Sequence, residues 1–395
     1  MVLKDKLKET FGFNDFKGNQ EEIIKSVLNK KDTLVVMATG SGKSLCYQLP
    51  SVIFKGVTIV VSPLISLMKD QIDKLNSIGI NSTHIRGVQS EEMILYLQEK
   101  ILNGYYKVIF ISPETLNSQK NVEVLKQLDV SLVVIDEAHC VSEWGHEFRP
   151  DFLRISEVVS FYPKAPILAL TATATKIVQG EIISIVGMKG AELFLSSFDR
   201  PNIKYSVVQK GRNPKSQLYN FLKTRRGDCG IVYCSTRKDV ESISAFLVVN
   251  GFSALPYHSG LPIELKNINQ KSFMNGSCKV IVSTTAFGMG IDKPNVRFIF
   301  HFSSPRTLSG YCQETGRSGR DGKPSECVML FSKKDSLKIL RISERAKVNN
   351  IEKVYQSLRD VVLFSGSNKC RRKILLEHFG QDYLKDNCGM CDNCL

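Results

Sequence analysis

The feature that most constrains the fold is a series of short apolar runs rich in β-branched residues, each bounded by turn residues and separated by amphipathic stretches. The runs lie at 32–40, 57–64, 107–114, 132–139 and 166–173 in the first half, and at 229–236, 253–260, 279–288 and 297–305 in the second. Strands that are apolar on both faces are typical of parallel sheets covered by helices. The alternation therefore predicts an α/β fold.

Length and polar segments predict the domain organisation. At 395 residues the chain exceeds the roughly 150 residues typical of one domain. The polar, basic stretch 208–217 interrupts the pattern and is the best linker candidate. We therefore expect one α/β lobe over 1–207 and a second over 208–335. The remaining segment, 336–395, is expected to be a small helical subdomain that ends in a cysteine cluster.

The charge of the chain restricts its partners. It carries 53 Lys and Arg against 39 Asp and Glu, a net charge of +14. This favours a polyanion, nucleic acid or an acidic membrane, although a solvated basic surface explains charge alone equally well. No apolar run approaches the ~20 residues of a membrane helix, and the charged N-terminus lacks the apolar core of a signal peptide. We expect an intracellular protein without a membrane partner, nuclear if eukaryotic and cytoplasmic if bacterial.

The segment 38–44, Ala-Thr-Gly-Ser-Gly-Lys-Ser, follows an apolar run and precedes an apolar helix. Glycines in such a loop let backbone N–H groups close around phosphate oxygens. The predicted phosphate contacts are Thr39, Gly40, Ser41, Gly42, Lys43 and Ser44. Lys43 would reach the β- and γ-phosphates, and the Ser44 hydroxyl would hold Mg²⁺. Met37 stands where the general pattern has glycine, and the alternative is a simple glycine-rich turn.

Two adjacent acids, Asp136 and Glu137, end a second apolar run. The carboxyl end of a strand is where an open α/β sheet binds ligands. We expect Asp136 to hold Mg²⁺ and Glu137 to polarise the attacking water as a general base. Taken alone, the pair also fits plain surface charges or a separate metal patch, and the phosphate loop decides between these interpretations.

The segment 311–322 carries two arginines, Arg317 and Arg320, three residues apart. On a helix they would share a face. Arginines supplied by a second lobe can neutralise charge that develops on the γ-phosphate. Arg320 is our first candidate for this role and Arg317 the second. Alone, such a run is more often a solvated basic helix.

Eleven cysteines and no secretory signal argue against a disulfide scaffold. Four of them, Cys370, Cys388, Cys391 and Cys394, crowd the C-terminal segment. Four thiolates suit a tetrahedral structural Zn²⁺. A C-x-x-C-x-x-C run with a distant fourth cysteine also suits a four-iron cluster, and unligated thiols are the third alternative. The seven other cysteines have apolar neighbours and are expected in the cores.

Several blocks together resemble the RecQ family of DNA helicases, within helicase superfamily two. They are FGFNDFKGNQEEII, ATGSGKS, LCYQLP, VSPLISLMKDQ, DEAHCVSEWGHEFRPDF, LTATAT, SFDRPNIKY, TTAFGMGIDKPNVRFI, GYCQETGRSGRDG and CRRKILLEHFG. The resemblance implies two RecA-like lobes with parallel sheets that sandwich ATP, plus a helical zinc-binding subdomain. It further implies 3′→5′ movement on single-stranded DNA and favours zinc over an iron cluster.

The resemblance also implies nucleotide contacts. Phe13 and Lys17 stand where the family stacks on adenine, and Gln20 where it reads the adenine edge. The family usually has arginine at the position of Lys17. Lysine stacks less well on a base and lacks the planar guanidinium that donates two parallel hydrogen bonds, so nucleotide affinity or base selectivity is expected to be weaker. Asp292 matches the residue near the ribose, and Gly288 opens the loop that lines the cleft. His139 is expected to contact other motifs and not a metal.

DNA contacts follow from the same resemblance. Backbone-tracking positions are expected at Ser62, Pro63, Leu64, Lys69, Ser235, Thr236, Arg237 and His258. The aromatic-rich segment after the acids is expected to offer stacking faces for bases at Trp144, Phe148 and Phe152. Arg149 would add charge, and His146 would bridge from this loop to the nucleotide.

The family commonly continues past the zinc site into a winged-helix domain, whereas this sequence ends at Leu395. We therefore expect a helicase on single-stranded and forked DNA, or alternatively a DNA-stimulated ATPase translocase with weak unwinding. A DEAH-type RNA helicase and a non-catalytic DNA-binding or strand-annealing module are the rivals. The first conflicts with SEWGHEFRPDF and the cysteine cluster. The second would lack Lys43, Glu137 or Arg320, all of which are present.

Overall fold

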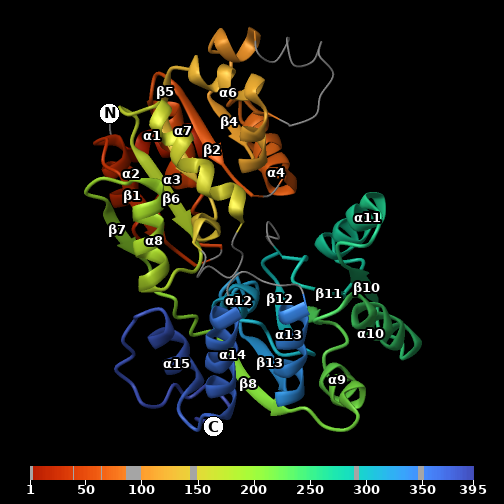
Figure 1. Cartoon of the computed structure of the whole chain (residues 1–395). Helices are drawn as coiled ribbons and strands as arrows, with labels where there is room; N and C mark the ends of the chain where they lie inside the picture. Colours follow the sequence, from red (N-terminus) through yellow and green to blue (C-terminus); the bar gives the residue numbers. More distant parts are fainter. Residues whose placement is uncertain are drawn as a thin grey trace. The chain divides into compact units, whose positions relative to one another are not determined.

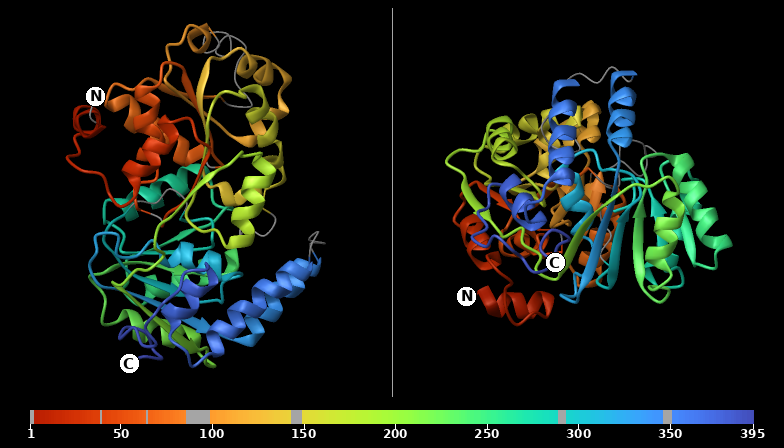
Figure 2. Two further views of the ribbon diagram at one scale, coloured as in Figure 1. Left: turned by 90° about the vertical axis from the view of Figure 1, so that its left-hand side faces the viewer. Right: turned by 90° about the horizontal axis from the view of Figure 1, so that it is seen from below.

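A computed structural model describes residues 3–38, 40–63, 65–85, 99–142, 149–288, 293–345 and 351–395. The chain divides into two compact units, Met1–Ser197 and Phe198–Leu395. Each unit contains one sheet with helices around it (Figures 1 and 2).

The first unit is built on a parallel sheet. Within the described residues it has seven strands in the order β3-β4-β2-β5-β6-β1-β7. The strands are β1 Thr33–Val36, β2 Val57–Val61, β3 Ser82–Ile85, β4 Val108–Ile111, β5 Val130–Ile135, β6 Ile167–Thr171 and β7 Glu192–Leu195. Strands β1, β2, β4 and β6 are buried along their whole length, because helices cover both faces.

The helices of the first unit supply the other half of its core. They are α1 Leu3–Phe11, α2 Gln20–Leu28, α3 Leu45–Ile53, α4 Ile65–Ser77, α6 Gln119–Lys126, α7 Ile155–Phe161 and α8 Lys176–Val186, with 3₁₀ turns η1 Pro113–Asn117, η2 Ala138–Val141 and η3 Pro150–Arg154. Ile23 of α2, Tyr47 of α3 and Met68 of α4 pack with Val35 and Val134 of the sheet in one apolar cluster.

The second unit repeats this architecture. Its described residues form a six-stranded parallel sheet in the order β10-β11-β9-β12-β13-β8. The strands are β8 Ile203–Gln209, β9 Cys229–Tyr233, β10 Ala254–Tyr257, β11 Val280–Ser283, β12 Val296–His301 and β13 Ser325–Phe331. The helices are α9 Pro214–Leu222, α10 Arg237–Val249, α11 Ile263–Met274, α12 Leu308–Thr315, α13 Lys333–Arg345, α14 Ile351–Gly366 and α15 Arg371–His378.

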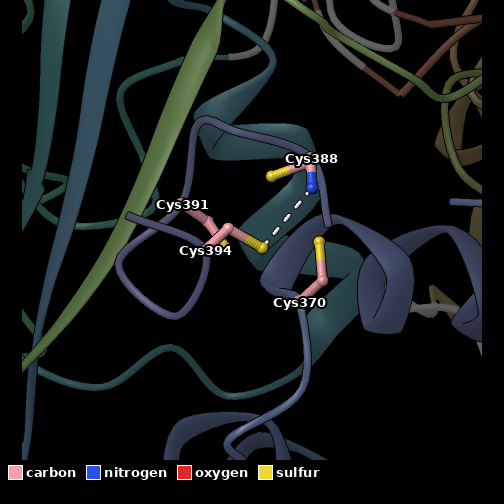
Figure 3. Close-up of side chains that lie close together, drawn as sticks. All are labelled: Cys370, Cys388, Cys391 and Cys394. Atoms are coloured by element: carbon pink, nitrogen blue, oxygen red, sulfur yellow. Dashed lines mark hydrogen bonds between the residues drawn. The ribbon is translucent and has the colours of Figure 1, made fainter. Parts of the chain in front are cut away.

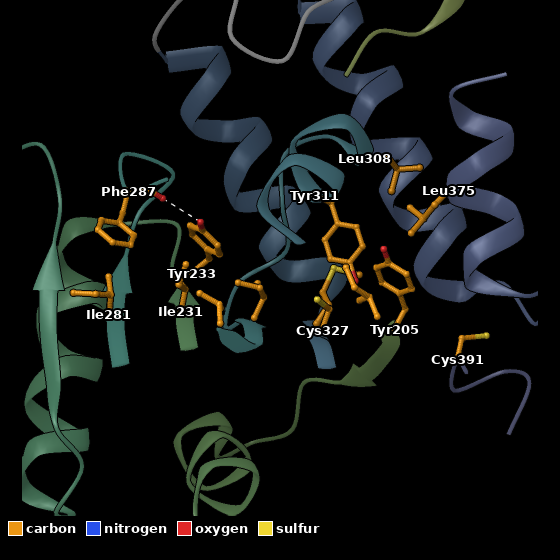
Figure 4. Close-up of a cluster of buried hydrophobic side chains, with 14 of the residues drawn as sticks. Tyr205, Ile231, Tyr233, Ile281, Phe287, Leu308, Tyr311, Cys327, Leu375 and Cys391 are labelled. Atoms are coloured by element: carbon orange, nitrogen blue, oxygen red, sulfur yellow. Dashed lines mark hydrogen bonds between the residues drawn. The ribbon is translucent and has the colours of Figure 1, made fainter. Parts of the chain in front are cut away.

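The C-terminal segment is helical, as the sequence predicts, and it shares a core with the second sheet. Cys391 and Leu375 belong to the same buried cluster as Tyr205 of β8 and Tyr311 of α12 (Figure 4). Helices α13 and α14 lie side by side (Figure 2). The C-terminal segment is therefore packed as part of the second unit.

Two parallel-sheet lobes are confirmed, but the division between them lies earlier than the sequence suggests. We expected it at 207/208 with a linker over 208–217. Instead the second unit starts at Phe198, because β8 pairs with β13 and belongs to the second sheet. The linker segment itself contains the end of β8 and the start of α9.

Strands β3, β7, β8 and β13 are absent from the predicted runs. Strand β13 lies inside the second sheet and is almost wholly buried. The other three are edge strands in their sheets, and their burial is partial or alternates along the strand. Since an edge strand is covered on fewer sides, it needs no continuous apolar run. Among the described residues, the helices are all too short or too polar to cross a membrane.

Candidate active site and metal centre

The phosphate loop connects β1 to α3, as the sequence predicts. Gly40 and Gly42 both have φ of +83°, a conformation that side chains with a Cβ rarely adopt. The Lys43 ammonium donates to the carbonyl oxygens of Met37 at 3.0 Å and Ala38 at 3.4 Å. These contacts place a positive charge at the carboxyl end of β1. Thr39 lies outside the described residues.

Gln20 joins the N-terminal turn to this loop. Its Oε1 accepts from the Lys17 backbone N–H at 2.8 Å, and its Nε2 donates to the carbonyls of Ser41 at 3.3 Å and Gly42 at 3.0 Å. A Cβ on Gly42 would lie 2.5 Å from Gln20 Nε2, so a larger residue there would displace the Gln20 amide from these contacts. Phe13 is 53% exposed, which leaves its ring accessible for stacking.

Asp136 lies at the carboxyl end of β5 and is enclosed by polar groups. Its Oδ2 accepts from Ser62 Oγ at 3.4 Å and its Oδ1 from the Glu137 backbone N–H at 3.0 Å. Burial and the neighbouring charge of Glu137 raise the pKa of Asp136 to about 7, against the opposing effect of Lys43. A bound cation would favour the charged carboxylate, so this donor set fits Mg²⁺.

Glu137 has a strained backbone, with φ of 50° and ψ of 46°. A non-glycine residue in this left-handed region costs roughly 1–3 kcal/mol. Its Oε2 is buried and, in the described part of the structure, makes no hydrogen bond. His139 Nδ1 lies 3.4 Å from this oxygen. Strain and an unsatisfied carboxylate oxygen are typical of a catalytic base.

His139 is neutral and fixed by a hydrogen bond. Its ring is fully buried, and burial together with the charges of Lys43 and Arg149 lowers its pKa to about 3. Nδ1 lies 2.9 Å from Thr171 Oγ1, and that hydroxyl donates to the Thr173 carbonyl at 3.2 Å. The ring links the acidic turn to the end of β6, as expected of a contact between motifs.

The predicted DNA contacts of the first unit have different surroundings. Ser62 is 1% exposed and its hydroxyl faces Asp136. Arg149 donates to the Pro63 carbonyl at 2.9 Å and so ties the aromatic-rich segment to the turn after β2. Lys69 is exposed on α4. The expected contacts Leu64, Trp144, His146 and Phe148 lie outside the described residues.

The expectation for Phe152 is wrong. Its side chain is fully buried in η3, so it offers no stacking face to a base. Pro150 opens this 3₁₀ turn, and the turn directs Phe152 into the core. Phe152 is therefore a core residue of the first unit.

The two arginines of the second unit do not share a helix face. Helix α12 ends at Thr315, and residues 316–320 form the segment that we call the arginine loop. Arg317 is 4% exposed and donates through Nη1 to the Gly288 carbonyl. A Cβ on Gly288 would lie 2.4 Å from Arg317 Cζ. Arg317 is thus committed to a contact within its own unit.

Predicted DNA contacts of the second unit gather at the carboxyl ends of β9 and β10. Arg237 is exposed and donates to Ser259 Oγ at 2.9 Å, and Ser235 is exposed nearby in the chain. His258 is buried, with Nε2 at 2.7 Å from Glu241 Oε1 and Nδ1 accepting from the Gly260 N–H. Asp292 lies outside the described residues.

The four C-terminal cysteines converge as a metal site would require (Figure 3). All four Sγ atoms lie within 4.8 Å of one another. Tetrahedral zinc holds thiolates about 3.8 Å apart. A four-iron cluster would hold them about 6 Å apart, because its iron atoms lie between the thiolates. The spacing therefore fits zinc and not the cluster.

Backbone and charge support the same donor set. Cys391 Sγ accepts from the Arg371 N–H and Cys394 Sγ from the Cys388 N–H, each at 3.4 Å. Burial opposes ionisation of Cys388, but hydrogen bonds from the Met390 backbone, Cys370 and Arg372 lower the pKa of this thiol to about 7. Such bonds to sulfur stabilise thiolates, the form that binds metals. Burial and the neighbouring thiols raise the pKa of Cys370 and Cys391, so a thiolate at Cys388 is shared among the four sulfur atoms.

Comparison with protein families gives three matches in chain order. Residues 17–180 match the DEAD/DEAH box helicase family, 213–322 the helicase conserved C-terminal domain and 333–395 the RecQ zinc-binding family. The chain belongs to the RecQ helicase family.

Curated RecQ relatives align over nearly the whole chain. The ATP-dependent DNA helicase RecQ of Haemophilus influenzae is 42% identical over 98% of this chain and 63% of its own length. The RecQ-like DNA helicase blm-1 of Caenorhabditis elegans is 41% identical over 99% of this chain and 41% of its own. The chain thus spans less than two thirds of the length of either relative.

Solved structures share the fold of this chain. Dbp5 of Saccharomyces cerevisiae, bound to RNA and ADP BeF3, matches 91% of this chain and 97% of its own with a TM-score of 0.69 at 17% identity. The DUF1998 helicase MrfA, bound to DNA, matches 96% of this chain and 56% of its own with a TM-score of 0.69 at 18% identity. At these identities the likeness shows the fold alone.

Sequence reasoning assigned no role to three residues that shape these sites in this RecQ chain. Thr171 contacts His139, and Arg200 and Asn202 contact the arginine loop. All three lie in blocks that resemble the family, LTATAT and SFDRPNIKY. The only sequence signal was this membership, because none of the three belongs to a phosphate- or metal-binding pattern.

Proposed function

We propose that the chain is an ATP-dependent DNA helicase of RecQ type that moves 3′→5′ on single-stranded DNA. One observation carries the proposal: Lys43, Asp136 and Glu137 come together at one edge of the first sheet, close enough for the Lys43 charge to act on the pKa of Asp136. Named relatives are ATP-dependent DNA helicases, and the chain aligns with them almost throughout.

In this proposal ATP binds at the phosphate loop. Phe13 and Lys17 stack on the adenine, and Gln20, already bound to the loop backbone, couples base recognition to the phosphate contacts. Lys43 leaves the carbonyls of Met37 and Ala38 for the β- and γ-phosphates. Because a lysine exchanges weak backbone partners for phosphate oxygens, this exchange favours binding.

Residues around the γ-phosphate then divide the chemistry. Ser44 and Asp136 would hold Mg²⁺, which supplies charge neutralisation at the phosphates. Glu137 Oε2 accepts the proton of the attacking water, as expected of its strained, unsatisfied position. Arg320 neutralises charge on the γ-phosphate as the bond to it breaks.

Single-stranded DNA is the nucleic acid along which the protein is proposed to move. Trp144 and Phe148 would stack on DNA bases in the first lobe, and Arg149 would add positive charge beside them. Pro63, Lys69, Ser235 and Arg237 are the proposed contacts to the DNA backbone. The contact from Arg149 to the Pro63 carbonyl connects these two groups of contacts. Forked DNA as the preferred substrate and an intracellular location also belong to the proposal.

A helicase assay tests the polarity and the nucleic acid together. Duplexes with a 3′ DNA tail, a 5′ DNA tail, a fork or a 3′ RNA tail should be offered with Mg²⁺ and ATP. We expect unwinding from the 3′ DNA tail and the fork, and little from the others. Equal action on the RNA tail would favour the RNA helicase. ATP hydrolysis without unwinding would favour the translocase.

Zinc content tests the metal centre. Metal analysis of the purified chain should find one zinc per chain and no iron. Strong visible absorbance would contradict this assignment, since it marks an iron–sulfur cluster. Cys391→Ser should release the metal and unfold the C-terminal segment, because Cys391 is buried in the core shared with the second sheet.

A further inference from the structure

The arginine loop, residues 316–320, is held by a side chain from far upstream. Arg200 donates through Nη1 to the carbonyl of Gly316 at 2.9 Å and through Nη2 to those of Ser318 at 2.8 Å and Gly319 at 3.0 Å. These carbonyls flank Arg317 and precede Arg320. One guanidinium thus fixes the backbone on which both arginines stand.

A second upstream residue supports the same loop. Asn202 Nδ2 donates to the carbonyls of Gly319 at 2.8 Å and Lys323 at 2.9 Å. Gly319 has φ of +54°, and a Cβ there would lie 2.5 Å from Asn202 Nδ2. The turn just before Arg320 therefore has little freedom to adopt another conformation while Arg200 and Asn202 are in place.

Arg200 itself lies in a segment that is anchored to the zinc-binding part of the chain. Phe198 stacks on Phe379 with ring centroids 4.3 Å apart, and the Phe198 N–H donates to Gln381 Oε1 at 2.9 Å. Asp199 pairs with Arg372, a side chain that also donates to the Ile203 carbonyl at 2.9 Å. Both residues before Arg200 are thereby fixed to α15 and the segment after it.

Within the described part of the chain, Arg200 is not held in an ordinary surface ion pair. Its hydrogen bonds among the described residues go to backbone carbonyls of a single loop, and a planar guanidinium is the side chain suited to hold several acceptors at fixed angles. Water could satisfy these carbonyl oxygens as hydrogen-bond acceptors without Arg200. The contacts are therefore best explained by a need to fix the loop's shape.

We propose that Arg200 is a positioning residue for ATP hydrolysis, which holds the arginine loop in the shape that presents Arg320 to the phosphate. Its own segment is braced by Phe379 and Arg372 next to the cysteine cluster, so the zinc-binding part of the chain supports the catalytic arginine through Arg200. The proposal rests on the ATP hydrolysis proposed above.

The test compares Arg200→Ala, Arg200→Lys and the control Arg225→Ala. Arg225 also donates to a backbone carbonyl, that of Phe221, and pairs with Glu326, but none of these groups lies in residues 316–320. Arg200→Ala should lower kcat for DNA-stimulated hydrolysis roughly 100-fold and change KM for ATP much less, because a misplaced catalytic group chiefly affects the transition state. Arg200→Lys should restore part of kcat, and Arg225→Ala should retain it.

Three readouts separate positioning from general damage. Single-stranded DNA affinity, zinc content and melting temperature of Arg200→Lys should stay close to those of the wild type. The factor by which Arg200→Ala lowers kcat should be at least tenfold smaller in an Arg320→Ala background than in the wild type. The effects of residues that act through one another are not additive.

The outcomes are distinct. Loss of kcat in Arg200→Ala that disappears in the Arg320→Ala background supports the proposal. An unchanged kcat in Arg200→Ala, or a full further loss on top of Arg320→Ala, overturns it while the proposed function stands. If Arg200→Ala fails to fold, an unchanged kcat in Arg200→Lys overturns it in the same way. A wild-type chain without ATP hydrolysis refutes the proposed function, and this proposal with it.

Discussion

The phosphate-loop edge of the first sheet and the arginine loop of the second unit are organised in different ways. In the first, side chains from neighbouring strand ends contact each other: Asp136 follows β5, and His139 reaches Thr171 at the end of β6. In the second, Arg317 and Arg320 lie beyond the end of a helix, and Arg200 holds their backbone from more than 100 positions upstream.

The two sites should therefore respond differently to substitution. Parallel strands bring their carboxyl ends to one edge, so the first site follows from the sheet itself. A loop after a helix has no such scaffold and depends on contacts from other segments. We therefore expect substitutions at the first site to act on chemistry directly, and those around the second to act on chemistry through the shape of the loop.

Glu137→Gln should have the largest effect. The amide cannot accept a proton from water, so kcat should fall by at least about 10³-fold while ATP still binds. Steady-state hydrolysis and binding of a fluorescent ATP analogue measure the two quantities. Glu157→Gln, on the surface beside Arg154, is the matched control. Substantial hydrolysis by Glu137→Gln would remove Glu137 from the role of base.

Arg320→Ala and Arg317→Ala should differ in kind. Arg320→Ala should lower kcat by about 10³-fold with little loss of stability. Arg317→Ala should also destabilise the second unit, by about 2 kcal/mol, because it leaves the Gly288 carbonyl without its charged donor. Urea unfolding and hydrolysis rates separate the two. Full DNA-stimulated activity in Arg320→Ala would move the catalytic role elsewhere.

Particular residues show how much the sequence could predict. The buried strands β1, β2, β4, β5 and β6 and the loop at Lys43 follow from local patterns, because both faces of these strands are covered. The edge strand β7, whose burial alternates, gave no such run. The cysteine pattern located the metal centre but left its metal open until the distances between the Sγ atoms favoured zinc.

Tertiary contacts account for what the sequence could not show. The helix expected under Arg317 and Arg320 ends at Thr315, and Phe152 enters the core where a stacking face was expected. Arg200 is one residue of a family-like block, and only the folded chain brings it to the arginine loop. Backbone strain at Glu137 likewise has no sequence signature, since any residue type can be forced into it by its surroundings.

His139→Asn should have the smallest effect, and its distinguishing result is the pH dependence of stability. The folded pKa of His139, about 3, lies below the ordinary 6.5, so between these values the unfolded chain binds the extra proton. Acidification from pH 6.5 to 5.5 should therefore cost the wild type about 1 kcal/mol through this residue. His139→Asn removes that cost and can still donate to Thr171.

Asp136 acts in the opposite direction. Its folded pKa is raised to about 7, so its contribution to stability grows as the pH falls. Asp136 is present in the wild type and in His139→Asn, so its contribution cancels when the two proteins are compared. Urea unfolding midpoints at pH 6.5 and 5.5 measure the pH dependence of stability for each protein. Equal pH dependence in the two proteins would contradict a neutral buried His139.

The rate of ATP hydrolysis, measured with and without single-stranded DNA for the wild type and Lys43→Ala, decides whether the phosphate loop forms an ATP site coupled to DNA. We expect Mg²⁺-dependent hydrolysis that single-stranded DNA stimulates in the wild type and that Lys43→Ala abolishes. Hydrolysis that persists in Lys43→Ala, or that ignores DNA in the wild type, would contradict this expectation.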